Sequence, residues 1–101
     1  MLPYSVFIEK RALGDVQEAF DYYNSQQFGL GDKFLSVIDK HFQSISQNPF
    51  YQIRYSNVRC LPVRKFPFMI HFVVDEKNKN AYVISILHTS QDPNNYPKSI
   101  R

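Results

Sequence analysis

The chain has 101 residues and a mass of 11.9 kDa, enough for one hydrophobic core and too little for two. Hydrophobic residues make up 44% and charged residues 21%, a balance typical of globular proteins, so we expect one folded domain over residues 1–101. No apolar run approaches the roughly 20 residues that span a bilayer, which argues against a membrane protein. The single cysteine and an N-terminus without a signal-peptide pattern favour the reducing cytoplasm.

The net charge of +3 is unevenly distributed along the chain. Residues 1–39 carry six acids and three bases, whereas residues 40–74 carry five bases and no acid. An acid-free basic segment is typical of a surface that faces phosphates. The alternative interpretation is a solvated sheet edge, whose Arg and Lys side chains oppose aggregation.

The first half of the chain predicts a strand followed by two helices. Residues 4–8 are short and β-prone, and apolar residues recur at helical spacing over residues 11–27 and again over residues 30–47. Asn48 and Pro49 end the second helix. Because a short link containing Gly29 and Gly31 joins the helices, they must fold back as an antiparallel hairpin.

The second half predicts a polar aromatic loop and three strands. The loop covers residues 50–56, and the strands cover residues 58–63, 66–74 and 81–88. Pro62 suggests an edge or a bulge, and His71 is expected to be partly exposed on the face that carries Met69 and Val73. The last strand is apolar on both faces, which indicates a central position, and residues 89–101 form an irregular tail. The expected fold class is α+β: a helical hairpin on a mainly antiparallel sheet, in the order β-α-α-β-β-β.

Candidate chemistry rests on bases and proton carriers, because a metal site is not indicated. None of the three histidines lies three or four residues from another or from Cys60, so neither a metal nor a cofactor is expected. Cleavage of RNA by its own 2′-hydroxyl needs a proton acceptor, cations and a proton donor. The residues that match these needs are Arg54, Arg59, Arg64 and Lys65 as cations, with His88 and Tyr96 as proton carriers.

Each of these residues also has a structural interpretation. His88 is then a hydrogen-bonded residue at a strand end, Tyr96 fixes the tail onto the sheet, and Arg59 pairs with the acidic first helix. For every residue taken alone, the structural interpretation is the stronger one, and only the combination favours catalysis.

The chain resembles the RelE/ParE superfamily of toxins from bacterial type II toxin–antitoxin modules, often labelled plasmid stabilisation proteins. The resemblance runs from about Ile8 to Tyr96, and the segments that carry it are Asp15-Val16-Gln17-Glu18-Ala19, Tyr22-Tyr23, Gly29-Leu30-Gly31-Asp32-Lys33-Phe34-Leu35, Asn48-Pro49, Val58-Arg59, Lys65-Phe66-Pro67-Phe68, His88 and Asp92-Pro93. It implies the β-α-α-β-β-β fold and a cognate antitoxin that wraps the toxin. RelE-like members cut mRNA on the ribosome without a metal, whereas ParE-like members inhibit DNA gyrase and are not nucleases.

The resemblance also suggests site residues. It implies that Arg59, Lys65, His88 and Tyr96 are catalytic, and we expect Arg54, Arg64 and Gln91 to contact RNA phosphates. Gln91 stands where many relatives have Arg, and a neutral amide stabilises a phosphorane less than a cation does.

Three hypotheses follow for the toxin. The first, slightly favoured by the basic segment, is an mRNA endonuclease (mRNA interferase) with ribosome and mRNA as partners. The second is a non-enzymatic inhibitor of DNA gyrase. The third is an attenuated member that binds only its antitoxin.

Overall fold

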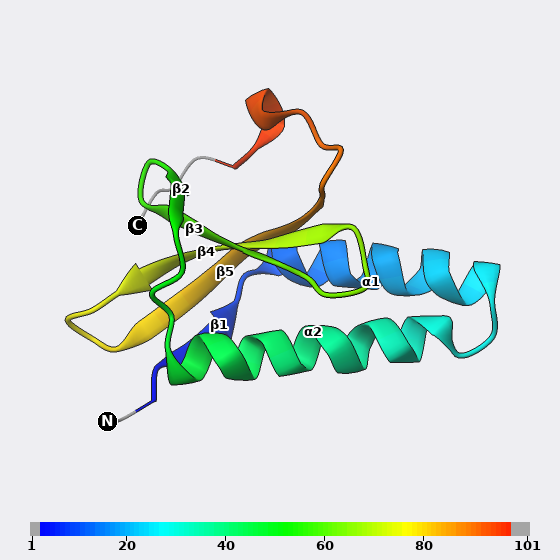
Figure 1. The fold of residues 1–101 in the computed structure, drawn as a ribbon, viewed down its shortest axis with the longest axis horizontal. Helices are drawn as coiled ribbons and strands as arrows, with labels where there is room; N and C mark the ends of the chain where they lie inside the picture. Colours follow the sequence, from blue (N-terminus) through cyan, green and yellow to red (C-terminus); the bar gives the residue numbers. More distant parts are fainter. Residues whose placement is uncertain (1–2, 98–101) are drawn as a thin grey trace.

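The computed structural model describes residues 3–97, which form two layers. One layer is a hairpin of helices α1 (Lys10–Gln26) and α2 (Leu30–Gln47). The other is a sheet of strands β1 (Ser5–Ile8), β2 (Ile53–Tyr55), β3 (Val58–Pro62), β4 (Phe68–Asp75) and β5 (Asn80–His88). A short 3₁₀ helix, η1 (Pro93–Asn95), lies in the tail. The expected α+β fold is confirmed, with one more strand than the sequence predicted (Figure 1).

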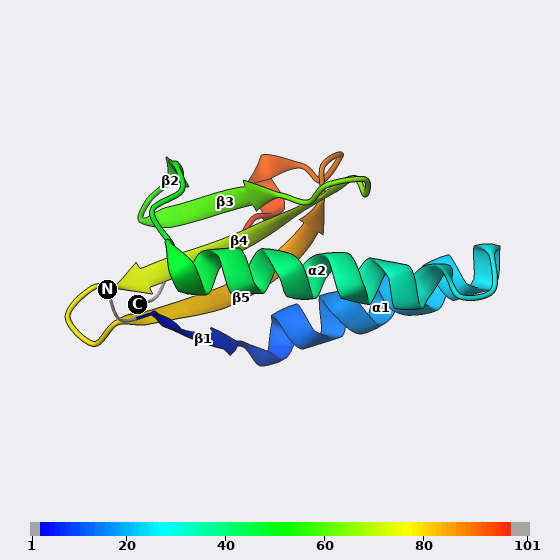
Figure 2. The ribbon, with the colours of Figure 1, turned by 60° about the horizontal axis from the view of Figure 1, so that its bottom comes forward.

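The helices pack through small and apolar side chains, and both predicted ranges are correct to within one residue. Gly29, the residue just before α2, has a φ of 83°, a left-handed conformation that glycine adopts without strain. Gly31 is needed for another reason, since a Cβ there would lie 2.7 Å from the carbonyl oxygen of Phe20. Two helices can therefore approach closely at the turn, where the hairpin projects beyond the sheet (Figure 2).

The sheet order is β1-β5-β4-β3-β2. β1 pairs with β5 in parallel, and the other neighbours are antiparallel, so the sheet is mainly antiparallel as expected. β5 lies between β1 and β4, which confirms its central position. The prediction of an uninterrupted loop over residues 50–56 was wrong, because β2 adds a short edge strand next to β3. Pro62 pairs only with β4, beyond the reach of β2, where its missing N–H is tolerated.

The two faces of the sheet are both apolar. The helix-covered face contributes Ile70, Phe72, Ala81, Val83 and Ile86 to one core cluster with both helices. On the opposite face, called the open face below, a smaller cluster contains Val58, Cys60, Val73 and Ile84. His71 belongs to the open face but is 0% exposed, so the expectation of partial exposure was wrong. The tail covers it, because the Tyr96 ring lies 4.7 Å from the imidazole ring, centroid to centroid.

One half-buried carboxylate links the two layers. Asp15 of α1 accepts hydrogen bonds through one oxygen from the Ser85 hydroxyl at 2.7 Å and from the Ile86 N–H at 2.9 Å. These contacts lie next to an irregularity in the β4–β5 pairing, where the register shifts between His71 and Phe72. β1 pairs with β5 only as far as Val83, so Asp15 supplies an acceptor for the part of β5 that extends beyond β1. Among the described residues, no helix is long and apolar enough to cross a membrane.

Candidate functional site

Arg59 lies on the helix-covered face of β3, because its neighbours Val58 and Cys60 occupy the open face. Its Nη1 donates a hydrogen bond of 2.8 Å to the carbonyl oxygen of Tyr51. Its guanidinium carbon lies 5.3 Å from the centroid of the Phe50 ring, a cation–π contact. The side chain is thus held by the segment that follows α2. The structure shows these contacts in place of the pairing with α1 that the sequence left open.

Lys65 and Arg64 lie in the loop between β3 and β4, where they line a hollow of about 300 Å³ together with Lys40 of α2. We call the surface formed by these three side chains the basic hollow. His41, which is 8% exposed, attaches the loop to α2. Its Nε2 accepts the Arg64 N–H at 3.2 Å, and its Nδ1 lies 2.7 Å from the carbonyl oxygen of Val37. Because a backbone N–H can only donate, the neutral ring carries its hydrogen on Nδ1, and both nitrogens are engaged.

His88 and Gln91 line a cavity of about 540 Å³ between α1 and the ends of β4 and β5. Asp15 and Glu18 also line it, and none of its lining residues, all within residues 3–97, is Arg or Lys. The His88 Nδ1 accepts the Ser90 N–H at 3.1 Å and lies 2.7 Å from the Ser90 hydroxyl. The neutral ring therefore carries its hydrogen on Nε2, where it can donate a hydrogen bond, and its acceptor nitrogen is already engaged.

Arg54 and Tyr96 meet on the open face, at a cavity of about 350 Å³ that Tyr55, Cys60 and Met69 help to line. The Tyr96 ring packs against Tyr55 with centroids 5.4 Å apart, in addition to its contact with His71. Tyr96 is therefore the side chain that fixes the tail to the sheet.

A buried polar cluster lies beneath Tyr96, and the sequence interpretation missed it. The Tyr55 hydroxyl is 3.0 Å from His71 Nδ1, and Cys60 Sγ is 3.6 Å from the same atom. Burial lowers the pKa of His71 to about 4 and raises the pKa values of Tyr55 and Cys60 to about 12 and about 11. All three side chains are thus neutral near pH 7. The position of His71 within a strongly apolar strand was the available signal.

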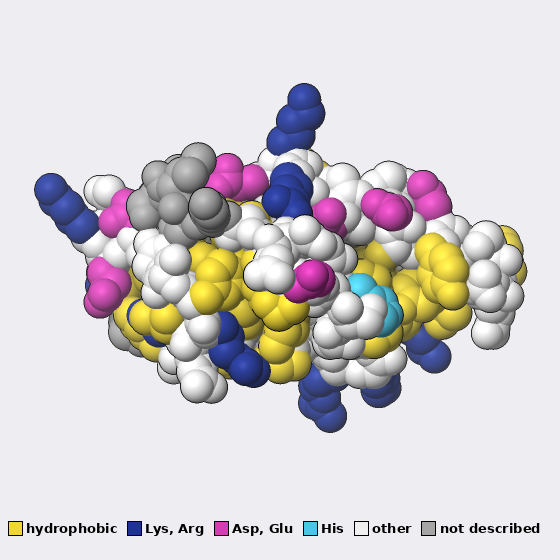
Figure 3. Space-filling model, turned by 90° about the horizontal axis from the view of Figure 1, so that it is seen from above, with side chains coloured by type: hydrophobic (Ala, Val, Ile, Leu, Met, Phe, Trp, Pro, Cys, Tyr) yellow, Lys and Arg dark blue, Asp and Glu magenta, His cyan; other side chains and the backbone are white. Residues whose placement is uncertain are grey.

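The structure distributes the sequence-predicted residues over separate places. It brings together Arg64 with Lys65, His88 with Gln91, and Arg54 with Tyr96, while Arg59 contacts the segment after α2. In Figure 3, several Lys and Arg side chains project from the lower edge and others from the top and the left, while acidic side chains are visible at the upper right and the left. Arg54 thus lies beside Tyr96, whereas Arg59, Arg64 and Lys65 lie apart from His88 and Tyr96.

Metal ligands do not gather in the described part of the chain. Among residues 3–97, no group of three or more His, Cys, Asp or Glu side chains is placed to hold a metal ion.

Comparisons with solved structures show the fold. A chain of the chromosomal ParDE toxin–antitoxin system from P. aeruginosa superposes with a TM-score of 0.74 at 19% identity, covering 84% of this chain and 95% of that chain. A chain of the RelBE2 toxin–antitoxin complex from Mycobacterium tuberculosis gives 0.65 at 15% identity, with 90% and 97% covered. A mutant of the E. coli RelE toxin in the free state gives 0.62 at 13% identity, with 88% and 86% covered.

Comparisons of sequence identify the family. A search of curated proteins finds no match. The sequence model of a family described as the ParE toxin of the type II toxin–antitoxin system parDE matches residues 6–93. The match covers most of the chain, including both α-helices and most of every strand. The chain therefore belongs to the ParE toxin family, within the RelE/ParE superfamily of type II toxins.

Proposed function

We propose that this protein is the toxin of a type II toxin–antitoxin system and that it acts by binding DNA gyrase, without breaking a bond itself. The observation that supports this is the separation of cations from groups that can accept a proton. Cleavage of RNA needs both kinds of group around one phosphate, within hydrogen-bond reach of the reacting atoms.

The separation can be followed at each of the three cavities. The cations of the basic hollow surround an imidazole, His41, whose two nitrogens are engaged by backbone groups. The cavity at His88 carries two carboxylates, which repel a phosphate, and its imidazole has no free acceptor nitrogen. On the open face, Arg54 and Tyr96 lie above a neutral buried cluster. None of these arrangements supplies a cation together with a proton acceptor.

The second candidate is ribosome-dependent cleavage of mRNA by Arg59, Lys65, His88 and Tyr96. One observation favours it: His88 is exposed and presents its Nε2 hydrogen at the surface, where it can donate a hydrogen bond to an RNA phosphate. The proton acceptor would then have to come from another group, since a Tyr hydroxyl has a reference pKa near 10. Likeness to the RelE chains is a likeness of fold and does not favour either candidate.

The partners follow from the family. We propose a cognate antitoxin, since the solved relatives include chains of the ParDE and RelBE systems. We further propose that the protein acts in the cytoplasm, where gyrase works, and that it needs no cofactor.

A paired assay tests the proposal. Purified toxin is added to gyrase supercoiling reactions and to a translation reaction in which mRNA cleavage is mapped, each with and without the co-expressed antitoxin. We expect inhibition of supercoiling that the antitoxin reverses, and no toxin-dependent cleavage. Arg59→Ala, His88→Ala and Tyr96→Ala are tested in parallel. Cleavage by the wild type that is lost in His88→Ala would establish the second candidate. A toxin that neither inhibits supercoiling nor cleaves mRNA would be an attenuated family member that binds only its antitoxin.

A further inference from the structure

We infer that the basic hollow, formed by Lys40, Arg64 and Lys65, is a binding site for the phosphodiester backbone of nucleic acid. We further infer that, when the toxin is on gyrase, this site contacts the duplex DNA that the enzyme holds; this second statement rests on the proposed function. The two statements are tested separately below.

The first argument is the concentration of unpaired positive charge. Residues 40–74 contain five bases and no acid, and the fold brings three of those bases from α2 and the β3–β4 loop to one hollow. No carboxylate lines the hollow, and within residues 3–97 no ion pair involves these three side chains. Like charges that share one place repel each other, and a bound anion removes that repulsion.

The second argument is that specific contacts fix the conformation of the loop that forms the hollow. His41 is buried and uses Nε2 to hold the Arg64 N–H, so the loop is attached to α2 beside Lys40. The next residue, Lys65, has a φ of 71°, a left-handed conformation that non-glycine residues seldom adopt. The loop is therefore held in one shape before any ligand arrives, which reduces the ordering that binding requires.

The third argument concerns the kind of anion. Arg can bind two phosphate oxygens at once and Lys acts as a point charge, so the three side chains suit successive phosphates of a strand. The lining consists of Val37, Lys40, His41, Ser44, Arg64 and Lys65, and its one ring, His41, is buried. Since the lining has no exposed ring on which a base can stack, we expect the hollow to contact the nucleic-acid backbone without distinguishing base sequences.

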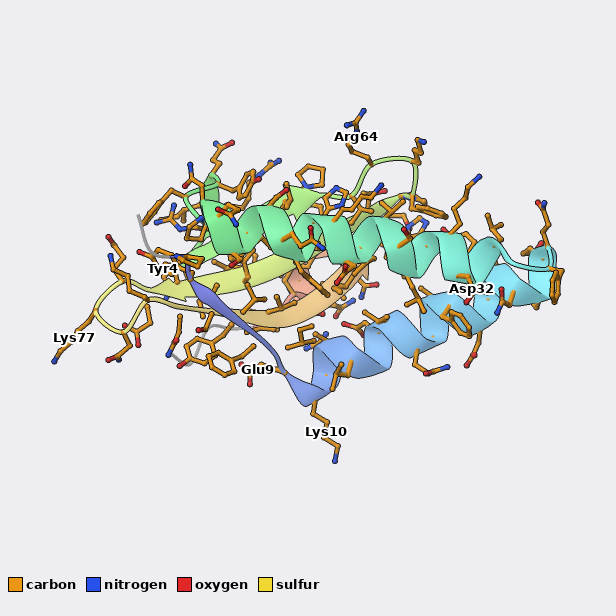
Figure 4. All side chains as sticks on the ribbon, turned by 90° about the horizontal axis from the view of Figure 1, so that it is seen from below. Tyr4, Glu9, Lys10, Asp32, Arg64 and Lys77 are labelled. Carbon is orange, nitrogen blue, oxygen red and sulfur yellow. The ribbon has the colours of Figure 1, made fainter. Side chains whose placement is uncertain are left out.

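Figure 4 shows how the site is exposed. The labelled Arg64 side chain points away from the body of the protein, on the α2 side, where a nucleic-acid duplex can approach. Lys10 lies on the opposite side, at the start of α1, and Lys77 lies at the end of the β4–β5 turn. These two lysines supply a control that removes the same charge from other places.

The experiment measures binding directly by fluorescence anisotropy, with a labelled 20-base-pair duplex in 50 to 200 mM KCl. We expect a Kd that rises with salt, with a log–log slope of about 2 to 3 for three phosphate contacts. Arg64→Gln/Lys65→Gln should weaken binding about 10-fold and reduce the slope by about 2. Lys10→Gln/Lys77→Gln lowers the net charge equally and should retain most of the affinity.

Three competitors identify the ligand. Single-stranded RNA of the same length should bind through the same residues, because the shared chemistry is the phosphodiester. Polyglutamate of equal charge should compete poorly, and competition as strong as that of DNA would instead make the hollow a site for an acidic protein segment. Equal losses in the two double variants, or no binding to any probe, would overturn the inference.

The gyrase statement has its own measurement. In the supercoiling assay, Arg64→Gln/Lys65→Gln should require about 3- to 10-fold more toxin for half-inhibition, and the control variant should not. Unchanged potency in a variant that has lost DNA binding would contradict the contact on gyrase and leave the phosphate site intact. A wild-type toxin that binds DNA but never inhibits gyrase would contradict the proposed function instead.

Discussion

His71 is a neutral imidazole enclosed by Tyr55, Cys60 and Tyr96, and its Nε2 has no hydrogen-bond partner. An unpaired buried nitrogen is costly, and the T-shaped contact with the Tyr96 ring offers it only a weak interaction. Adding a proton would place a charge there with no water around it. Burial is the main reason that the pKa of His71 is lowered to about 4; Arg11 adds to this effect and Asp15 opposes it.

The lowered pKa predicts a loss of stability in mild acid. His71 titrates near 6.5 in the unfolded chain and near 4 in the folded chain, so between these values the unfolded chain binds more protons. The free energy of unfolding should therefore fall as the pH falls from 6.5 towards 4, by about 1–2 kcal/mol between pH 7 and pH 5. Urea denaturation at a series of pH values measures this dependence.

Two variants separate His71 from the other titrating groups. His71→Gln should be less stable at pH 7 but should lose the dependence between pH 7 and pH 5. His88→Gln replaces an exposed imidazole and should keep the wild-type dependence. If His71→Gln followed the wild-type curve, the acid sensitivity would belong to other residues.

At the scale of elements, two glycines of the helical hairpin lie in opposite surroundings, one crowded and one open. Gly31 is where α2 approaches α1, because its N–H donates to the Asn24 side chain at 2.8 Å and its α-carbon faces the Phe20 carbonyl. Gly14 lies within α1, and a Cβ there would contact nothing within 4 Å. The same substitution should therefore change stability in opposite directions at the two positions.

Glycine-to-alanine substitutions test this difference. Gly31→Ala places a methyl group against a backbone oxygen that cannot move alone, and we expect a loss of about 1–3 kcal/mol. Gly14→Ala removes the entropic cost of glycine in a helix, and we expect a gain of about 0.5–1 kcal/mol. Thermal and urea unfolding of the two variants give both values. A stable Gly31→Ala variant would show that the helices can separate at the turn.

The elements also show what the sequence could and could not predict. The helix bounds predicted from the sequence were accurate because the signals that mark them are local: the spacing of apolar residues, the glycines between the helices and Asn48-Pro49. β2 was missed because Ile53 and Tyr55 form a three-residue edge strand, whose pairing depends on β3 and not on its own pattern. The parallel pairing of β1 with β5 is equally non-local. The burial of His71 depends on a tail contact by Tyr96, far along the chain.

The candidate site shows the same limit. The basic character of residues 40–74 was readable, and Arg64 and Lys65 do lie together. The sequence did not predict on which face of the sheet the Arg59 side chain lies, because Pro62 left the register of β3 open. The pairing of Arg59 with Phe72 places it on the helix-covered face. The tautomers of His41 and His88 depend on backbone N–H groups of Arg64 and Ser90, which no residue pattern shows.

At the scale of the whole molecule, Asp15 connects the helical layer to the sheet across 70 residues of sequence. The core cluster on the helix-covered face also includes residues from both layers, such as Phe34 and Phe72. Neither layer buries its apolar surface without the other. We therefore expect the helices and the sheet to unfold together, as one domain.

Asp15→Ala tests this coupling. It leaves the buried Ser85 hydroxyl and the Ile86 N–H without an acceptor, and we expect the free energy of unfolding to fall by about 2–4 kcal/mol. Glu18→Ala, an exposed change in the same helix, should cost less than about 0.5 kcal/mol. In both variants, far-UV circular dichroism, which follows the helices, and tyrosine fluorescence should report one urea transition, because the loss at Asp15 is shared by both layers. Two separate transitions in Asp15→Ala would mean that the hairpin and the sheet are independent units joined mainly by this carboxylate.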